Sequence, residues 1–223
     1  MTVELSKVFD ILFSKKEEME LFFDFYIFEK MKINKNEFVD NKDQFMKFID
    51  FCLHTRRTPK NNDINVGMKY FSNNYEEILK LIKTKNINQL KKMIYEAKGV
   101  GQKIGSFILE VIYLYSNYRN SDIAKVLFVP IDTHIERIFY ECLNARKIPK
   151  QTSKYTSEEF IKFQNALNRF TNNRSRLYFD YLWFIGKMFC AKTTTDNEKF
   201  NKGYKLCNYC WIKEYCKNKN KWL

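Results

Sequence analysis

Apolar residues recur at helical spacing along most of the chain, whereas no run alternates apolar and polar residues as a half-buried strand would. The pattern therefore predicts an all-α protein. The most regular stretch follows residue 103, where the apolar positions fall on one face of a helix. The predicted helices cover residues 3–27, 45–53, 75–83, 87–97, 104–115, 135–142, 160–170 and 174–189.

Two helix starts carry a capping-box pattern, in which a hydroxyl residue is followed three positions later by glutamate. Thr133 with Glu136 is one such pair, and Thr156 with Glu159 is the other. The short apolar connection 126–131 precedes the first pair, and we expect it to be extended and buried. The chain has only six glycines and three prolines, too few for an all-β fold with many tight turns.

Composition indicates a globular protein with an anionic partner. The 223 residues are 45% hydrophobic and carry a formal net charge of +13, which suits a nucleic acid or an anionic membrane surface. A compositional bias toward lysine, asparagine and isoleucine would produce the same excess. No apolar run is long enough for a membrane span, and charged residues interrupt the N-terminal apolar pattern where a signal peptide would lie. We therefore expect a cytoplasmic protein without membrane contact.

The segment Gly99-Val100-Gly101-Gln102-Lys103 joins two predicted helices. Its glycines allow a tight turn and a close approach of backbone to a ligand. The first turn of the following helix offers N–H donors and a positive dipole end to a phosphate group. Lys103 is either a further phosphate contact, a solvated surface lysine or a nucleophile, which would have to lose its proton.

Asp132 lies in Val129-Pro130-Ile131-Asp132-Thr133-His134, at the start of another predicted helix. A carboxylate at this position caps the helix or takes part in chemistry beside a nucleophile. Because Lys103 and Asp132 both lie at helix starts in a basic chain, they are the candidate catalytic pair, with a polyanion as the substrate.

The cysteines are concentrated near the C-terminal end, which in a reducing compartment favours metal ligation over disulfides. Sixteen, two and five residues separate Cys190, Cys207, Cys210 and Cys216. Four thiolates suit a [4Fe–4S] cluster or a tetrahedral zinc ion. Cys52 and Cys142 fall on apolar helix faces and are expected in the core.

These motifs, in this order, resemble the endonuclease III branch of the helix-hairpin-helix DNA glycosylases. The resemblance implies that Gly99, Val100, Gly101 and Gln102 form a DNA-binding hairpin, with Lys103 at the position of the catalytic lysine. Val129 to Ile135 resembles the family's Val-Asp-Thr-His segment, with Asp132 at the catalytic aspartate. The spacing of the last three cysteines is similar to that of the family's iron–sulfur ligands, which makes [4Fe–4S] the expected cofactor rather than zinc.

The resemblance also implies a two-lobed architecture. A six-helix barrel-like domain with the hairpin would occupy residues 35–131. The helical iron–sulfur domain would combine residues 1–34 with 132–223, the N-terminal helix packing on the C-terminal part. A monomer acting on double-stranded DNA is expected, associated with the nucleoid if the source is prokaryotic.

The implied function is base excision repair. A glycosylase with lyase activity would remove a damaged base, by default an oxidised pyrimidine, through a Schiff base on Lys103 assisted by Asp132. The alternatives are a monofunctional glycosylase for another lesion or mismatch, and a non-catalytic binder of damaged or abasic DNA.

Two further sets of DNA contacts are expected. Arg56 and Arg57, in a polar connection over residues 54–63, either lie near where the family inserts a side chain into the gap left by a flipped base or form a solvent-facing basic turn. Lys192 and Lys199 lie between Cys190 and Cys207, in a segment longer than the six residues usual in the family. That segment is either an enlarged DNA-binding loop or a solvated insertion.

Overall fold

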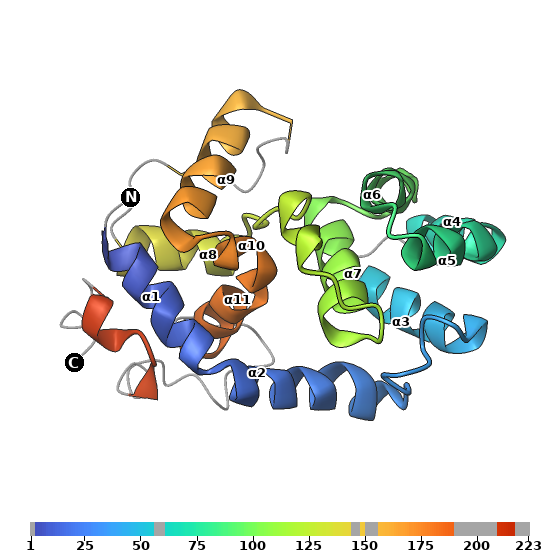
Figure 1. Cartoon of the computed structure of the whole chain (residues 1–223), viewed down its shortest axis with the longest axis horizontal. Helices are drawn as coiled ribbons and strands as arrows, with labels where there is room; N and C mark the ends of the chain where they lie inside the picture. The colour runs from blue at the N-terminus through green and yellow to red at the C-terminus, as the bar shows by residue number, and fades with distance from the viewer. Residues whose placement is uncertain (1–2, 56–60, 144–147, 150–155, 190–208, 217–223) are drawn as a thin grey trace. The chain divides into compact units, whose positions relative to one another are not determined.

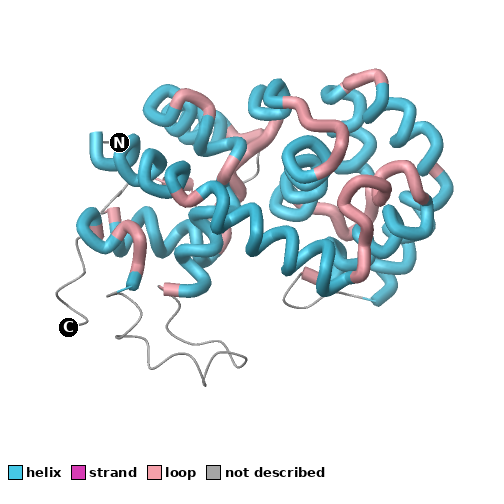
Figure 2. Tube along the Cα trace, turned by 60° about the horizontal axis from the view of Figure 1, so that its bottom comes forward, coloured by secondary structure: helices cyan, strands magenta, loops and turns pink. Residues whose placement is uncertain are grey.

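The protein is helical throughout the part of the chain that the structure, a computed structural model, describes. The described residues are 3–55, 61–143, 148–149, 156–189 and 209–216. Within these ranges the trace consists of helices and loops and contains no strand (Figure 2). The predicted all-α class is confirmed. None of the helices in these ranges is both long and apolar enough to cross a membrane.

The chain divides into two compact units, and one of them is made of two separate stretches of sequence. The continuous unit is Glu17–Phe128, and the discontinuous unit combines Met1–Lys16 with Val129–Leu223. Residues 17–34 thus fall in the continuous unit, whereas the division based on the sequence grouped them with the C-terminal part.

The continuous unit surrounds one buried helix. Nearly every residue of α7, from Ile104 to Tyr115, is buried, as expected of a helix that other helices enclose (Figure 1). The elements of this unit are α2 (Lys16–Phe23), the π-helical turn η1 (Asp24–Glu29), α3 (Lys42–His54), α4 (Asn61–Asn73), α5 (Tyr75–Lys83), α6 (Ile87–Glu96), α7 (Gln102–Tyr115) and the 3-10 turn η2 (Ser121–Lys125).

A polar cluster around Asp40 joins distant parts of this unit. The Tyr118 hydroxyl donates to both carboxylate oxygens of Asp40, at 2.7 and 2.8 Å, and Lys83 Nζ lies 2.9 Å from Oδ1. Partial burial acts to raise the pKa of Asp40, but the hydrogen bonds from Lys83 and Tyr118 outweigh it and hold the pKa below its ordinary value. Burial and the bond to Asp40 raise the pKa of Tyr118 to about 12.

The discontinuous unit packs the N-terminal helix against the C-terminal helices. Arg174 Nη2 lies 2.6 Å from Asp10 Oδ1, and the ring of Phe13 meets Tyr178 edge to face. Helix α1 thus rests on residues that follow it by more than 140 positions in the sequence, those of α9 and of the segment after it. The elements are α1 (Val3–Ser14), α8 (Thr133–Arg137), the π-helical turn η3 (Ile138–Cys142), α9 (Glu158–Thr171), α10 (Arg174–Leu177), α11 (Phe179–Met188) and the 3-10 turn η5 (Lys213–Tyr215).

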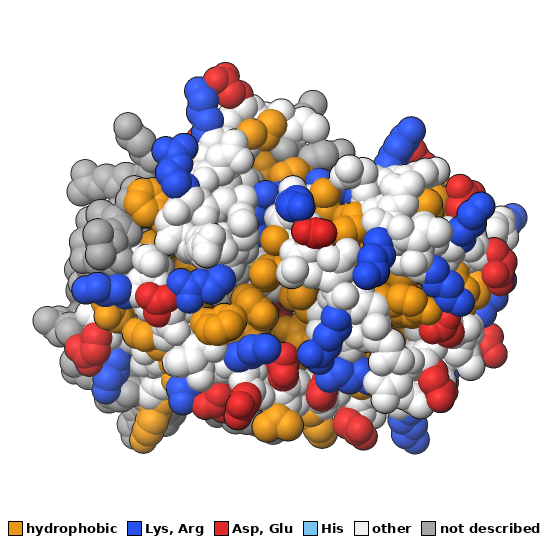
Figure 3. All heavy atoms as spheres, viewed as in Figure 1, with side chains coloured by type: hydrophobic (Ala, Val, Ile, Leu, Met, Phe, Trp, Pro, Cys, Tyr) orange, Lys and Arg blue, Asp and Glu red, His pale blue; other side chains and the backbone are white. Residues whose placement is uncertain are grey.

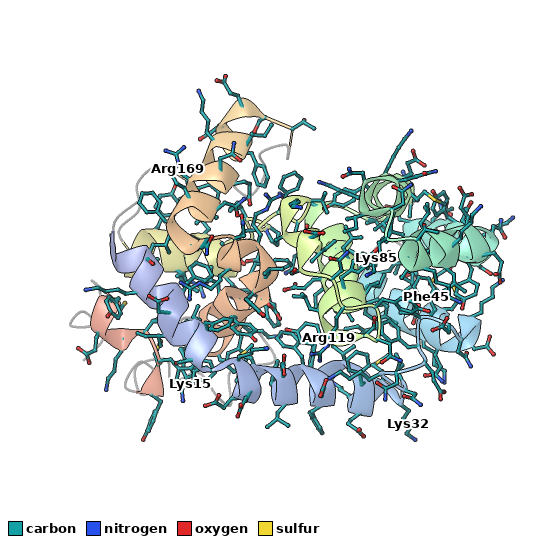
Figure 4. The ribbon with its side chains drawn as sticks, viewed as in Figure 1. Lys15, Lys32, Phe45, Lys85, Arg119 and Arg169 are labelled. Atoms are coloured by element: carbon teal, nitrogen blue, oxygen red, sulfur yellow. The ribbon has the colours of Figure 1, made fainter. Side chains whose placement is uncertain are left out.

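Three predicted elements differ in the structure. The single helix predicted over residues 3–27 is broken at Lys15, which Figure 4 labels between α1 and α2. The predicted polar connection 54–63 includes the start of α4, a helix that the apolar pattern did not reveal. The helix predicted over residues 174–189 is interrupted at Tyr178. Residues 126–131 lie outside helices, and Val129, Pro130 and Ile131 are buried as expected.

Candidate functional site

The chain turns sharply between α6 and α7. Gly99 has φ +83°, a left-handed conformation that costs a residue with a Cβ roughly 1–2 kcal/mol. The Val100 N–H donates to the Ala97 carbonyl at 3.1 Å and closes the turn. Gly101 follows in an extended conformation, is exposed, and immediately precedes α7. The helices and glycines predicted from the sequence therefore form a tight connection between two packed helices.

Helix α4 braces the turn from one side. A Cβ on Gly67 would lie 2.5 Å from the Lys98 carbonyl oxygen, so only glycine lets α4 approach so closely. Lys98 Nζ lies 3.9 Å from Asp63 Oδ1 at the start of α4. The sequence analysis did not identify Gly67, although a glycine inside a helix is unfavourable and signals a packing requirement.

Tyr95 braces the turn from α6. Its hydroxyl donates to the Gln102 carbonyl at 3.2 Å and lies 2.9 Å from Ser106 Oγ, so it bonds to the first two turns of α7. The side-chain Nε2 of Gln102 is buried. Of the predicted hairpin contacts, Gln102 is partly buried and Gly101 is exposed.

Lys103 is the second residue of α7 and its side chain is exposed. No side chain caps the start of this helix, because its N-cap residue is Gly101. The positive end of the α7 dipole and a lysine thus lie together at an accessible turn. Such a start is suited to an anionic group.

Asp132 occupies the N-cap of α8 and is half-buried. Its Oδ1 accepts from the backbone N–H groups of His134 and Ile135, both at 3.0 Å. The cap residue is therefore Asp132, and the prediction that Thr133 caps this helix is wrong. The second predicted capping box is also displaced by one residue, since Ser157 rather than Thr156 accepts from the Phe160 N–H. In both places the observed cap, aspartate or serine, is a better N-cap residue than the neighbouring threonine.

Two helices hold the segment that carries Asp132. Gln164 on α9 is fully buried, donates from Nε2 to the Val129 carbonyl and accepts at Oε1 from the Val129 N–H, each at 2.8 Å. Gly186 on α11 rests against the first turn of α8, where a Cβ would lie 2.7 Å from the His134 carbonyl oxygen. The sequence analysis missed Gln164, because nothing in the sequence pairs it with a residue 35 positions away.

The two candidate catalytic residues belong to different units. Lys103 lies in the continuous unit and Asp132 in the discontinuous unit, and the surroundings of each are those of its own unit. Lysine and arginine side chains are interspersed with acidic ones on the face drawn in Figure 3. Neither sign of charge is gathered in a single patch on that face.

Two of the four candidate metal ligands, Cys210 and Cys216, lie in the described part of the chain. Cys210 is 7% exposed and Cys216 is half-buried. The ring of Trp211 stacks on Phe184 with centroids 5.6 Å apart and lies 6.2 Å from Phe189. Since Phe189 directly precedes Cys190, the chain next to one candidate ligand packs against the chain next to another.

The remaining predicted site residues lie outside the described ranges: Arg56, Arg57, Cys190, Lys192, Lys199 and Cys207. Among the described residues, no three His, Cys, Asp or Glu side chains are grouped as metal ligands would be. The shielding of Cys210 and the aromatic contacts beside it fit a buried cluster held by thiolates.

Searches of protein-family models, of curated proteins and of solved structures find no match to this chain.

Proposed function

We propose that the protein is a DNA glycosylase with lyase activity, similar to endonuclease III, in which Lys103 is the nucleophile and Asp132 its carboxylate partner. The observation that carries the proposal is the position of Lys103: exposed in the first turn of α7, directly after a braced glycine turn. Asp132, at the start of α8, adds the second residue of the motif. The substrate would be duplex DNA with an oxidised pyrimidine, bound by a monomer.

The turn would bind the DNA backbone. Gly101 is exposed and leaves space for a phosphate group beside the first turn of α7. Contacts of this kind fix the register of a protein on DNA but do not read its sequence. The damaged nucleotide would then rotate out of the duplex, at a cost of roughly a few kcal/mol that is smallest for a weakened pair.

The amine of Lys103 would attack C1′ of the flipped nucleotide. A lysine becomes nucleophilic when it is desolvated or lies beside another cation. Because Lys103 is exposed in the free protein, contact with DNA would have to supply that desolvation. The new C1′–N bond forms as the bond to the base breaks, and the base leaves with the electron pair and takes up a proton.

Asp132 would stabilise the positive charge that develops on the sugar and assist transfer of the lysine proton. The sugar ring opens to a Schiff base on Lys103. Loss of a proton from C2′ then expels the 3′ phosphate by β-elimination and cuts the strand. Hydrolysis of the Schiff base restores the lysine.

Cys190, Cys207, Cys210 and Cys216 would hold a [4Fe–4S] cluster, which when bound would fold the C-terminal segment. The burial of Cys210 and the packing of Trp211 on α11 support this assignment over an exposed site. Purified protein should contain iron rather than zinc, and Cys210→Ala should lower the iron content together with the visible absorption of the cluster.

Borohydride trapping tests the proposed chemistry. The protein is incubated with duplexes that carry an oxidised pyrimidine, an oxidised purine, a mismatch or a preformed abasic site, and borohydride reduces any Schiff base to a stable adduct. We expect an adduct with the abasic and oxidised-pyrimidine duplexes and none with Lys103→Ala. The matched control is Lys98→Ala, which removes a lysine of the same turn and should keep the adduct while lowering the salt slope of binding by about one.

The same assay separates the alternatives. Base release without an adduct would identify a monofunctional glycosylase. Tight binding of the lesion duplexes with neither adduct nor base release would identify a non-catalytic damage binder. An adduct that persists in Lys103→Ala would overturn the assignment of the nucleophile.

A further inference from the structure

The backbone three residues before Asp132 is held by a single buried side chain. Both backbone groups of Val129 bond to the amide of Gln164, one donating and one accepting, at 2.8 Å each. Gln164 is 1% exposed and comes from the middle of α9. A side-chain amide that bonds in this way reproduces the pairing of a neighbouring strand, so it fixes both the position and the direction of the chain.

The chain between Val129 and Asp132 has little freedom to absorb a displacement. Pro130 has a fixed φ angle, and Pro130 and Ile131 are both buried. Beyond Asp132, the close contact of Gly186 with the His134 carbonyl holds the first turn of α8. The orientation of the carboxylate is therefore set by contacts before and after it.

We propose that Gln164 is a positioning residue, which acts through Val129 to fix the carboxylate of Asp132 for the proposed reaction. This inference rests on the proposed function for its catalytic part. A buried glutamine with a purely structural role would contribute to stability but not to the rate of chemistry in folded protein. Loss of a positioning residue lowers the reaction rate of folded protein, whereas loss of a purely structural residue lowers only the stability.

Gln164→Leu removes both hydrogen bonds and leaves an apolar side chain of similar size. We expect single-turnover base release to slow by about 100-fold, the effect of a displacement of roughly 1 Å at a reacting group. The dissociation constant for the lesion duplex should stay within about twofold, because Gln164 is buried and cannot touch DNA. Assays run well below the melting temperature of each variant.

Gln164→Glu supplies a readout that a structural role would not give. A protonated glutamic acid can donate to the Val129 carbonyl and accept from its N–H, as glutamine does, whereas the carboxylate can only accept. Burial favours the protonated acid. The rate of this variant relative to wild type should therefore approach one at low pH and decline as pH rises, whereas the ratio for Gln164→Leu should not vary with pH.

Thr171→Val is the matched control. It removes another buried hydrogen bond of α9, from the Thr171 hydroxyl to the Leu167 carbonyl at 2.7 Å, which lies within the helix itself. This variant should lose stability but keep the wild-type rate. An unchanged rate in Gln164→Leu, or an equal loss of rate in Thr171→Val, would overturn the proposal.

Hydrogen exchange distinguishes this inference from the proposed function. The amides of His134 and Ile135, which Asp132 caps, should exchange on the order of tenfold faster in Gln164→Leu than in wild type, equivalent to the loss of about one hydrogen bond. Thr171→Val should leave them protected. If the wild type releases no base from any duplex, the proposed function fails, and the exchange result alone decides whether Gln164 orients Asp132.

Discussion

The starts of α7 and α8 differ in how their backbone N–H groups are treated: a side chain of the protein caps α8, and no side chain caps α7. Every helix begins with backbone N–H groups that have no partner within the helix. At α8 the carboxylate of Asp132 bonds to two of them. At α7 the N-cap is glycine, which brings no side chain to this task. The first start is satisfied by the protein, and the second can accept an anion from outside.

The segments that precede the two helix starts also differ in burial. The turn before α7 is exposed at Gly101 and Lys103. Gly67 packs against the Lys98 carbonyl of this turn, and the Tyr95 hydroxyl bonds to the Gln102 carbonyl. The segment before α8 is buried and bonded by Gln164. If the proposed roles hold, the carboxylate is already held in place by the protein, whereas the exposed Lys103 would have to be desolvated and oriented by the bound DNA.

Asp132→Asn should produce the largest effect, because it separates the cap from the charge. Asparagine caps a helix about as well as aspartate, so the melting temperature should stay close to that of wild type. Base release should fall by roughly 10²–10⁴-fold, as expected for the loss of an acid–base group. Single-turnover kinetics and thermal unfolding measure the two effects on the same samples.

The companion variant Asp132→Ala loses the cap as well as the charge. It should be equally slow and also less stable by ~1 kcal/mol. Equal stability of the Asn and Ala variants would contradict the capping role, and a wild-type rate in Asp132→Asn would contradict the catalytic one.

Gly186→Ala tests how tightly the start of α8 is held. The added methyl group would lie 2.7 Å from the His134 carbonyl oxygen, so α11 or α8 must shift. We expect a loss of ~1–3 kcal/mol in the free energy of unfolding, typical of overpacking. Urea unfolding measures it, with Met188→Ala at an exposed position of the same helix as the control. Equal losses in the two variants would mean that the contact is not tight.

The two glycines of the turn before α7 should respond differently to the same substitution. Gly99→Ala should cost ~1–2 kcal/mol, because its φ angle of +83° is strained for alanine. Gly101→Ala should cost less than Gly99→Ala, because Gly101 is extended and an added methyl group meets no atom within 4 Å beyond the adjoining residues. That methyl group would occupy the space offered to a phosphate, so DNA binding should weaken. Unchanged binding in Gly101→Ala would remove this residue from the interface.

We expect the smallest effect from Asp40→Asn, which tests how the folding stability, rather than the reaction rate, depends on pH. Because hydrogen bonds from Lys83 and Tyr118 hold the pKa of Asp40 below its ordinary value of 3.8, Asp40 stabilises the protein above that value. Its contribution disappears as pH falls through the lowered pKa. Asp40→Asn should therefore lower stability near neutral pH by less than ~1 kcal/mol, since solvent screens this exposed pair. The difference from wild type should vanish in acid.

Activity offers the control for that measurement. Asp40 belongs to neither helix start, so the dependence of base release on pH should be the same in Asp40→Asn as in wild type. A shifted profile would show that stability, rather than Asp132, limits the reaction in acid.

Periodicity predicted the helices whose apolar face is complete and missed those that tertiary contacts maintain. The bounds of α5 were predicted residue for residue, because its apolar positions are regular and polar residues flank it. Helix α4 was missed, since it is rich in asparagine and contains Gly67. Its interior glycine makes sense only beside the Lys98 carbonyl, a contact that no local pattern contains.

The candidate site shows the same limit. The turn and the carboxylate could be located from local sequence, because glycine, lysine and aspartate have strong preferences at helix ends. The residues that support them could not. Gln164 and Tyr95 look like ordinary positions on helix surfaces until folding brings them to Val129 and Gln102.

The break at Lys15 has a consequence for how the chain is made. Helix α1 leaves the ribosome first, but the helices against which it packs, α9 and α10, follow more than 140 residues later. The continuous unit, residues 17–128, is a compact unit in its own right and is complete well before then. Since domains tend to fold as units during synthesis, the middle of the protein should fold first. The apolar residues of α1 would then stay unburied until α9 and α10 have been synthesised.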